Sequence, residues 1–337
     1  QPTPEAPAAA PLGPQAIGFG GFRDASARSD EFELSVVGLP AAAVSGDLHA
    51  WLTGEGAPLD LGKVLPDASG NLEFVYAAPD GANLLATYSG FLLTVEAAGS
   101  SAASPSSDVL LQNTIPAGAL GPVRLLLVSA PDTRKNVAYT LGALHETEQL
   151  FLHAKAVNAA ALLGDFDSLN RHIEHIFTIL DAPDGPNYRD FDSHGFIDDA
   201  SDRFGLRNYA DQISALAQAA ADAPDATLNV KTHAAHLVIL ADNYRARADA
   251  IVDLALKAHQ ATANAERQQY TAQLLELAAQ MLDGVDANGN GVIEPITGEG
   301  GAYTLPFDAL VVAVGAVPLR LGPEEGTGVP RFAAAAA

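Results

Sequence analysis

The sequence predicts a multidomain α+β protein with an N-terminal antiparallel β-sandwich, a four- or five-helix bundle and a C-terminal β segment. Short β-rich runs, spaced about ten residues apart, fill residues 32–128. Alanine-rich segments with a helical period begin near residue 136, and two acidic glycine-containing loops accompany them. The predicted domains are a Pro/Ala-rich spacer or assembly arm (1–30), the β-sandwich (31–130), the helical bundle with both loops (136–300) and the β segment (301–332).

Composition restricts the chemistry. The chain has 337 residues, of which 48% are hydrophobic and 18% charged, so it can bury more than one core. A formal net charge of -23 disfavours nucleic acid as a partner, because phosphate backbones would be repelled. The absence of cysteine excludes disulfides, thiolate metal sites and cysteine nucleophiles. No run of 18 apolar residues is present, so we expect no membrane span.

The first 30 residues predict an exported protein. The stretch QPTPEAPAAAPLGPQ is typical of a spacer that follows a removed export signal, which indicates a secreted or cell-surface location. A boundary inside a cytoplasmic protein is the alternative. The glycine-rich residues 16–22 are a candidate arm for assembly.

The β-rich region carries an ordered series of motifs. They are Leu39-Pro40, His49-Ala-Trp51-Leu52, Leu61-Gly62-Lys63-Val64, Gly70-Asn71-Leu72, Leu93-Thr94-Val95-Glu96 and Ser104-Pro105-Ser106. Over less than a third of the chain, this order resembles the extracytoplasmic C-terminal domain of anti-sigma-K factors. The resemblance implies a domain that lies outside the membrane. This sequence departs from the family because it does not contain the family's sigma-binding segment. Trp51 is expected to be a buried core residue rather than a ligand platform.

Five helices are predicted after the sandwich, at residues 137–163, 167–180, 206–221, 228–260 and 263–282. Gly164 with Asp165, and Gly284, provide stop signals, and Thr227 provides a start signal. The connection 181–202 would be unusually long for a structureless loop, which favours a bound cation within it.

The two acidic loops, residues 190–198 and 286–294, resemble EF-hand-type calcium loops. Each places oxygen-bearing side chains at alternate positions before a glycine at the sixth, as a hard cation requires. The twelfth positions are Ser201 and Thr297 instead of glutamate, and Asp199, Asp202, Glu294 or Glu299 could substitute. The alternative is a solvated turn without an ion. The predicted calcium ligands are Asp190, Asp192, His194, Phe196, Asp198, Asp199, Asp202, Asp286, Asn288, Asn290, Val292 and Glu294.

Histidines concentrate in the helical region, where eight of nine lie between residues 145 and 259. Two pairs are spaced three apart and therefore share a helical face, and His145, Glu148 and His153 lie along a further helix. If these faces met, they could hold zinc, copper, iron or haem. Structural or surface roles are the alternative. The predicted ligands of a transition metal are His172, His175, His233, His236 and His145.

Residues 309–317 near the end of the chain fit a strand or a short buried helix. An unpaired strand there would be an association site.

No nucleotide-binding loop or nucleophile elbow occurs, so we nominate no catalytic residues. The predicted function is a calcium-stabilised extracellular structural or surface-assembly subunit whose partners are copies of itself or another surface protein. The alternative is an extracytoplasmic metal or haem protein, and the weaker alternative is a sensing ectodomain.

Overall fold

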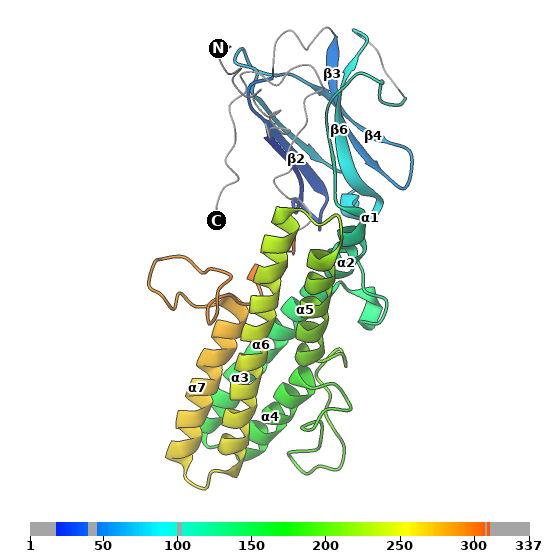
Figure 1. Cartoon of the computed structure of the whole chain (residues 1–337). Coiled ribbons are helices and arrows are strands. Elements are labelled where there is room, and N and C mark those ends of the chain that lie inside the picture. Colours follow the sequence, from blue (N-terminus) through cyan, green and yellow to red (C-terminus); the bar gives the residue numbers. More distant parts are fainter. Residues whose placement is uncertain (1–17, 40–45, 100–102, 307–308, 311–337) are drawn as a thin grey trace, which may run out of the picture. The chain divides into compact units, whose positions relative to one another are not determined.

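A computed structural model describes residues 18–39, 46–99, 103–306 and 309–310 (Figure 1). Two compact units divide between residues 115 and 116. The first contains two antiparallel sheets and the second contains helices, which confirms the α+β class. Within the described part of the chain, no helix combines the length and the apolar content that crossing a bilayer requires.

Among its described residues, the first unit contains seven strands in two sheets. The three-stranded sheet has the order β1-β2-β5, and the four-stranded sheet has the order β4-β3-β6-β7, with every neighbouring pair antiparallel. The strands are β1 (Gly18–Arg23), β2 (Glu31–Val36), β3 (Asp47–Gly54), β4 (Leu59–Val64), β5 (Leu72–Ala77), β6 (Tyr88–Glu96) and β7 (Val109–Thr114), and the four-residue helix α1 (Leu84–Thr87) precedes β6.

Aromatic residues fill the core of this unit. Trp51 of β3 is 1% exposed and donates a 2.9 Å hydrogen bond from Nε1 to Oγ1 of Thr94, which confirms the prediction of a buried tryptophan. Phe32 of the first sheet and Phe91 of the second have ring centroids 5.7 Å apart. Side chains of the two sheets therefore share a core.

Strand β1 corrects the prediction that residues 1–30 are a spacer or arm. Residues 18–23 pair with β2 along their whole length, from Gly18 opposite Val36 to Arg23 opposite Glu31. The glycines have a packing reason, since a Cβ on Gly20 would lie 2.7 Å from the Phe91 ring. A short glycine-rich run has little strand propensity of its own, and tertiary pairing determines its conformation. Residues 1–17 lie outside the described part of the chain.

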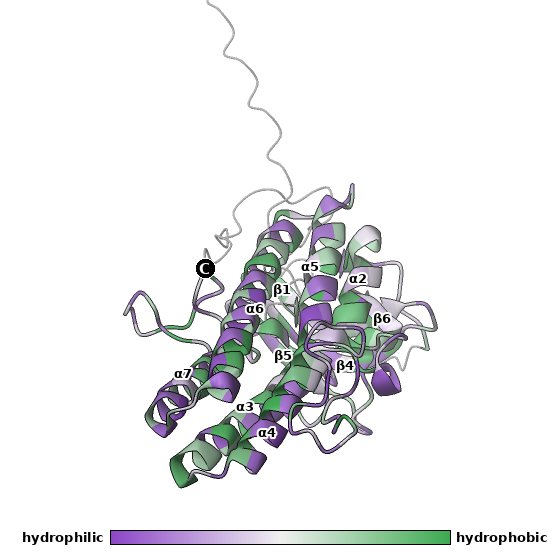
Figure 2. Ribbon diagram, turned by 90° about the horizontal axis from the view of Figure 1, so that it is seen from below, coloured by the Kyte–Doolittle hydropathy of each residue, from purple (hydrophilic) through white to green (hydrophobic). Residues whose placement is uncertain are grey.

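In the part that the structure describes, the second unit contains one short and five long helices. Helix α3 packs against α4, α5 and α7, and α6 packs against α5 and α7. Apolar residues run along α3, whereas polar and apolar residues alternate along α6 and α7 (Figure 2). The helices are α2 (Ala117–Leu127), α3 (Tyr139–Leu163), α4 (Phe166–Leu180), α5 (Leu206–Asp222), α6 (Leu228–Gln260) and α7 (Asn264–Asp283), with a 3₁₀ turn at Arg134–Asn136. The five long helices lie within two residues of their predicted bounds.

Helix α2 corrects a further expectation, because residues 123–129 read as a strand in sequence. Its buried residues Ala119, Val123, Leu126 and Leu127 recur at the helical period on one face. Pro122 inside the helix and the Val/Leu-rich composition obscure this period. Helical structure therefore begins before the predicted change near residues 129–136.

The predicted β segment at 301–332 is wrong for the residues that the structure describes. Residues 304–306 and 309–310 are helical, and Leu305 and Ala309 are fully buried. Backbone hydrogen bonds from Ala302 to Met281 and from Tyr303 to Leu282 attach this segment to the end of α7 instead of to a sheet. Residues 311–332 lie outside the described part.

A tight turn joins α3 to α4. Gly164 ends α3 in the left-handed conformation, with φ 71°, and Asp165 caps α4 by accepting a hydrogen bond from the backbone N–H of Ser168. Because only two residues separate the helices, they run antiparallel side by side. Residues at equal distances before and after the turn therefore lie at the same level.

Candidate metal centre

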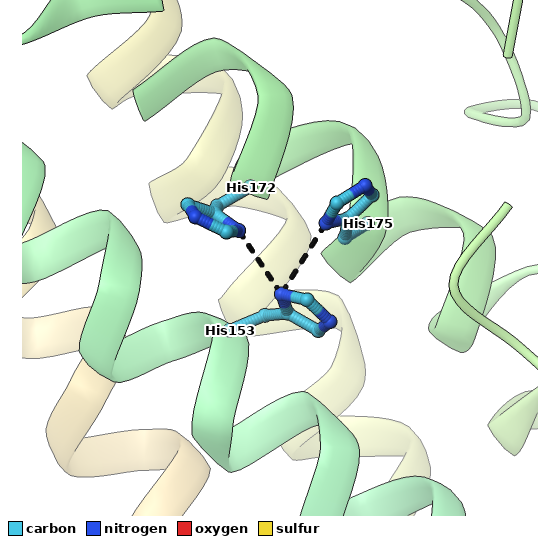
Figure 3. A group of neighbouring side chains, drawn as sticks. All are labelled: His153, His172 and His175. Atoms are coloured by element: carbon cyan, nitrogen blue, oxygen red, sulfur yellow. Dashed lines mark hydrogen bonds between the residues drawn. The ribbon is translucent and has the colours of Figure 1, made fainter. Parts of the chain in front are cut away.

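Three histidine side chains converge between α3 and α4. His153 projects from α3, and His172 and His175 project from successive turns of α4 (Figure 3). Nδ1 of His153 lies 3.1 Å from Nδ1 of His172 and 3.3 Å from Nδ1 of His175. One ring nitrogen from each residue lies within 4.8 Å of the other two, and all three side chains are half-buried.

These distances match the spacing of ligands around a metal ion. Zinc binds imidazole nitrogen at about 2.0–2.1 Å, so two nitrogens of a tetrahedral site are about 3.3 Å apart. Without an ion, Nδ1 of His153 has one in-plane N–H or lone pair with which to meet two neighbours. This nitrogen can therefore make a linear hydrogen bond to only one of the two neighbouring histidines. The other neighbour's nitrogen lies close to it without a well-oriented hydrogen bond. A cation at the centre would accept all three lone pairs.

The surroundings keep these rings neutral. Burial, with repulsion from the other two rings, lowers the pKa of His153 to about 4. Burial also lowers the pKa values of His172 and His175, although the carboxylates of Asp198, Asp192 and Asp199 partly offset the effect on His175. Neutral imidazole is the form that binds metal, so the ligands are deprotonated at neutral pH.

The structure gathers only part of the predicted histidine set. His172 and His175 join the cluster, whereas His145 is exposed on α3 and lies outside it. His233 and His236 lie together on α6, with ring centroids 5.0 Å apart, but no third described His, Asp or Glu completes a metal-sized group with them.

His153 is the member of the cluster that is missing from the predicted set. It stands 11 positions before Gly164, and His175 stands 11 positions after it. In two antiparallel helices joined at Gly164, this symmetry places both residues at one level. The helix break at Gly164 and the equal spacing of His153 and His175 from it are the sequence features that could have identified His153.

In the first acidic loop, Asp190, Asp192 and His194 come together. The backbone N–H groups of Ser193 and Gly195 donate to Oδ1 and Oδ2 of Asp190, at 2.6 and 2.8 Å. His194 Nδ1 contacts Asp192 and its Nε2 lies 3.7 Å from Asp198 Oδ2.

Three other predicted ligands of this loop, Asp199, Asp202 and Phe196, do not join that group. The Tyr188 hydroxyl donates to Asp199 at 2.7 Å, and the Tyr209 hydroxyl donates to Asp202. The Phe196 side chain is 61% exposed, so a calcium role would fall to its backbone carbonyl alone.

In the second loop, Asp286 has the same arrangement. The backbone N–H groups of Gly289 and Gly291 donate to its two oxygens at 2.7 and 2.8 Å. The side-chain amides of Asn288 and Asn290 donate to Oε2 of Glu294 at 2.9 and 2.6 Å. Four predicted ligands thus lie together, and the fifth, Val292, has an exposed side chain.

Each loop closes around a fully buried glutamate from outside its nine-residue run. Glu174 of α4 accepts the backbone N–H groups of Phe191 and Asp198, at 2.6 Å each. Glu299 accepts those of Asn288 and Glu294, at 3.2 and 3.0 Å. In both loops, the ninth residue donates to this carboxylate. Sequence analysis missed Glu174, because it lies 16 residues before Asp190.

Comparison with known proteins gives no relative: no family model, no curated protein and no solved structure matches this chain. Function therefore has to be argued from the geometry of the described residues.

Proposed function

We propose that the helical unit binds a divalent transition metal through His153, His172 and His175. The proposal is carried by the two distances from Nδ1 of His153 to Nδ1 of His172 and of His175, which suit tetrahedral coordination. Three neutral nitrogen donors favour zinc or copper over calcium or magnesium, which prefer oxygen. The close approach of the three rings fits a small ion better than a haem, which places its two axial ligands on opposite faces.

A metal titration tests the proposal. Full-length protein, stripped of metal, is titrated with zinc in a calorimeter, and the result expected is one tight site. His153→Ala should remove that site, since it deletes the ligand that contacts both others. The matched control is His233→Ala with His236→Ala, which removes two imidazoles at the same three-residue spacing from α6. Equal zinc binding by the wild type and His153→Ala would refute the assignment.

We propose calcium binding by the two acidic loops as a second function. Its support is that both loops repeat one hydrogen-bonding pattern, with the first aspartate accepting from the fourth and sixth residues and a buried glutamate accepting from the ninth. This role agrees with the extracellular, calcium-stabilised structural module that the sequence predicts. A rise in thermal midpoint with calcium, relative to chelator, tests it, and an unchanged midpoint would refute it.

Finer features of the fold and location are part of the same proposal. The Phe32 and Phe91 contact supports a β-sandwich in the first unit. The packing of α3 against three neighbouring helices supports a helical bundle in the second unit.

We propose an extracytoplasmic location on the strength of the N-terminal composition. Limited proteolysis of intact cells, with a cytoplasmic marker as control, tests that location.

A further inference from the structure

We propose that a metal ion held by the three histidines keeps one coordination position open to solvent, where water exchanges with a small nitrogen or oxygen donor. This inference rests on the proposed metal binding and concerns what the bound ion can do.

The cluster offers three protein ligands, which is one fewer than a closed zinc site has. Among the described residues, the group that contains His153, His172 and His175 includes no carboxylate and no fourth histidine. Zinc sites with a structural role are closed by four protein ligands, whereas sites that handle small molecules have three and keep the fourth position for water or substrate. The ligand set found here is of the second kind.

The three histidines approach the proposed ion from one side. All three ligands come from only two adjacent helices, α3 and α4, and the side chains are half-buried instead of enclosed. Ligands from one side of an ion leave its opposite side uncovered. A fourth ligand can therefore approach from solvent without displacing a histidine.

Three loop carboxylates that act on His175 already have polar partners. The loop residues Asp192, Asp198 and Asp199 are close enough to act electrostatically on His175. Asp192 pairs with Arg171 at 3.4 Å and contacts His194, and Asp199 accepts from Tyr188. Oδ2 of Asp198 lies 3.7 Å from Nε2 of His194, and the backbone N–H of Asp198 donates to Glu174. These contacts hold the acidic loop beside the centre as a source of negative charge, separate from the ligands themselves.

The ligand class follows from charge and size. Three neutral imidazoles leave the full double positive charge on the ion, so water, azide or free imidazole would be attracted. The loop carboxylates weaken this attraction for anions. We therefore expect imidazole, which is neutral, to bind more tightly than azide.

Cobalt provides the test, because its visible absorption reports the ligands around it. The metal-stripped full-length chain is loaded with one equivalent of cobalt, and imidazole and azide are titrated separately. The proposal predicts a saturable spectral change at one ligand per cobalt, with a lower dissociation constant for imidazole. Metal analysis after gel filtration must show that cobalt remains bound.

The outcomes separate the two levels of the proposal. If cobalt binds but its spectrum does not respond to either ligand, the fourth position is closed and this inference is wrong, while the three-histidine site stands. If wild-type protein and His153→Ala give the same cobalt spectrum, the metal site itself is wrong and this inference falls with it. Binding of azide but not imidazole would overturn the proposed role of the loop carboxylates.

Discussion

Glu174 accepts a 2.6 Å hydrogen bond from the backbone N–H of Asp198, although 24 residues separate them. Its other oxygen accepts from Phe191, and the same helix carries His172 and His175 of the histidine cluster. The helix that supplies two of the three proposed metal ligands is thus also the helix to which the acidic loop is attached.

Replacing Glu174 should therefore affect both stability and metal binding. In Glu174→Gln, the amide nitrogen cannot accept a hydrogen bond, so one loop N–H is left buried without a partner. We expect a loss of about 1.5–3 kcal/mol in the free energy of unfolding, measured with denaturant, because the lost acceptor is charged. Zinc affinity should also fall, since α4 loses a constraint between His172 and His175.

Glu299→Gln is the matched control for this change. It removes the same kind of acceptor from the second loop, where Glu299 binds Asn288 and Glu294, but leaves α4 intact. We expect comparable destabilisation and unchanged zinc affinity. A similar loss of zinc affinity in both variants would show that it follows from general destabilisation.

The pH dependence of zinc binding should be weak between pH 7 and pH 6. Three histidines with an ordinary pKa near 6.5 would together lose about 30-fold in affinity over this range, because protons compete for the nitrogens. Burial lowers the pKa of His153 to about 4 and lowers those of His172 and His175, so protons compete less for the nitrogens and the loss in affinity should be smaller than 30-fold. Calorimetric titrations at both pH values measure the change, and a 30-fold loss would contradict the low pKa values.

Glu146 should make folding less favourable as pH rises. Burial, with the neighbouring charge of Asp202, raises the pKa of Glu146 from 4.5 to about 7. The folded state therefore holds a proton that the unfolded state releases between these values. This contribution to stability is complete below pH 4.5 and is lost as pH rises to about 7, amounting to roughly 2–3 kcal/mol.

The variant Glu146→Gln isolates this effect, because glutamine does not titrate. Denaturant unfolding of both proteins at pH 5 and pH 7 gives the comparison. The difference in stability between wild type and variant should change by that amount in favour of the variant as pH rises. A difference that stays constant with pH would exclude a raised pKa.

Calcium should stabilise each loop separately. At a calcium concentration 100 times the dissociation constant, a site that forms only in the folded state adds about 2.7 kcal/mol. Asp190→Ala and Asp286→Ala each remove the aspartate that accepts backbone hydrogen bonds within one loop. Each variant should therefore lose about half of the stabilisation by calcium. Comparing the calcium increment, not the absolute stability, corrects for the structural cost of each substitution. An undiminished increment in both variants would place calcium elsewhere.

Local chemistry made much of the helical unit predictable from sequence. Gly164 and Asp165 mark the α3 to α4 turn, and the spacing of His172 and His175 puts both on one face. These features depend on neighbours within one or two turns of helix. The alternation of oxygen donors before Gly195 and Gly291 likewise indicated where the loops tighten.

Features that depend on tertiary contact could not be predicted in the same way. His153 joins the histidine cluster only because α3 and α4 pack side by side, and Glu174 contacts the first loop only because the chain folds back onto α4. Strand β1 and helix α2 have weak or mixed local preferences, so pairing with β2 and burial of one face determine their conformations.

X-ray absorption spectroscopy at the zinc edge tests the central claim most directly. Protein loaded with one equivalent of zinc should show three imidazole nitrogens at about 2.0–2.1 Å, together with one oxygen ligand from solvent. In His153→Ala that number should fall below three. A wild-type spectrum with fewer than three imidazoles, or with oxygen ligands alone, would contradict a metal centre built from His153, His172 and His175.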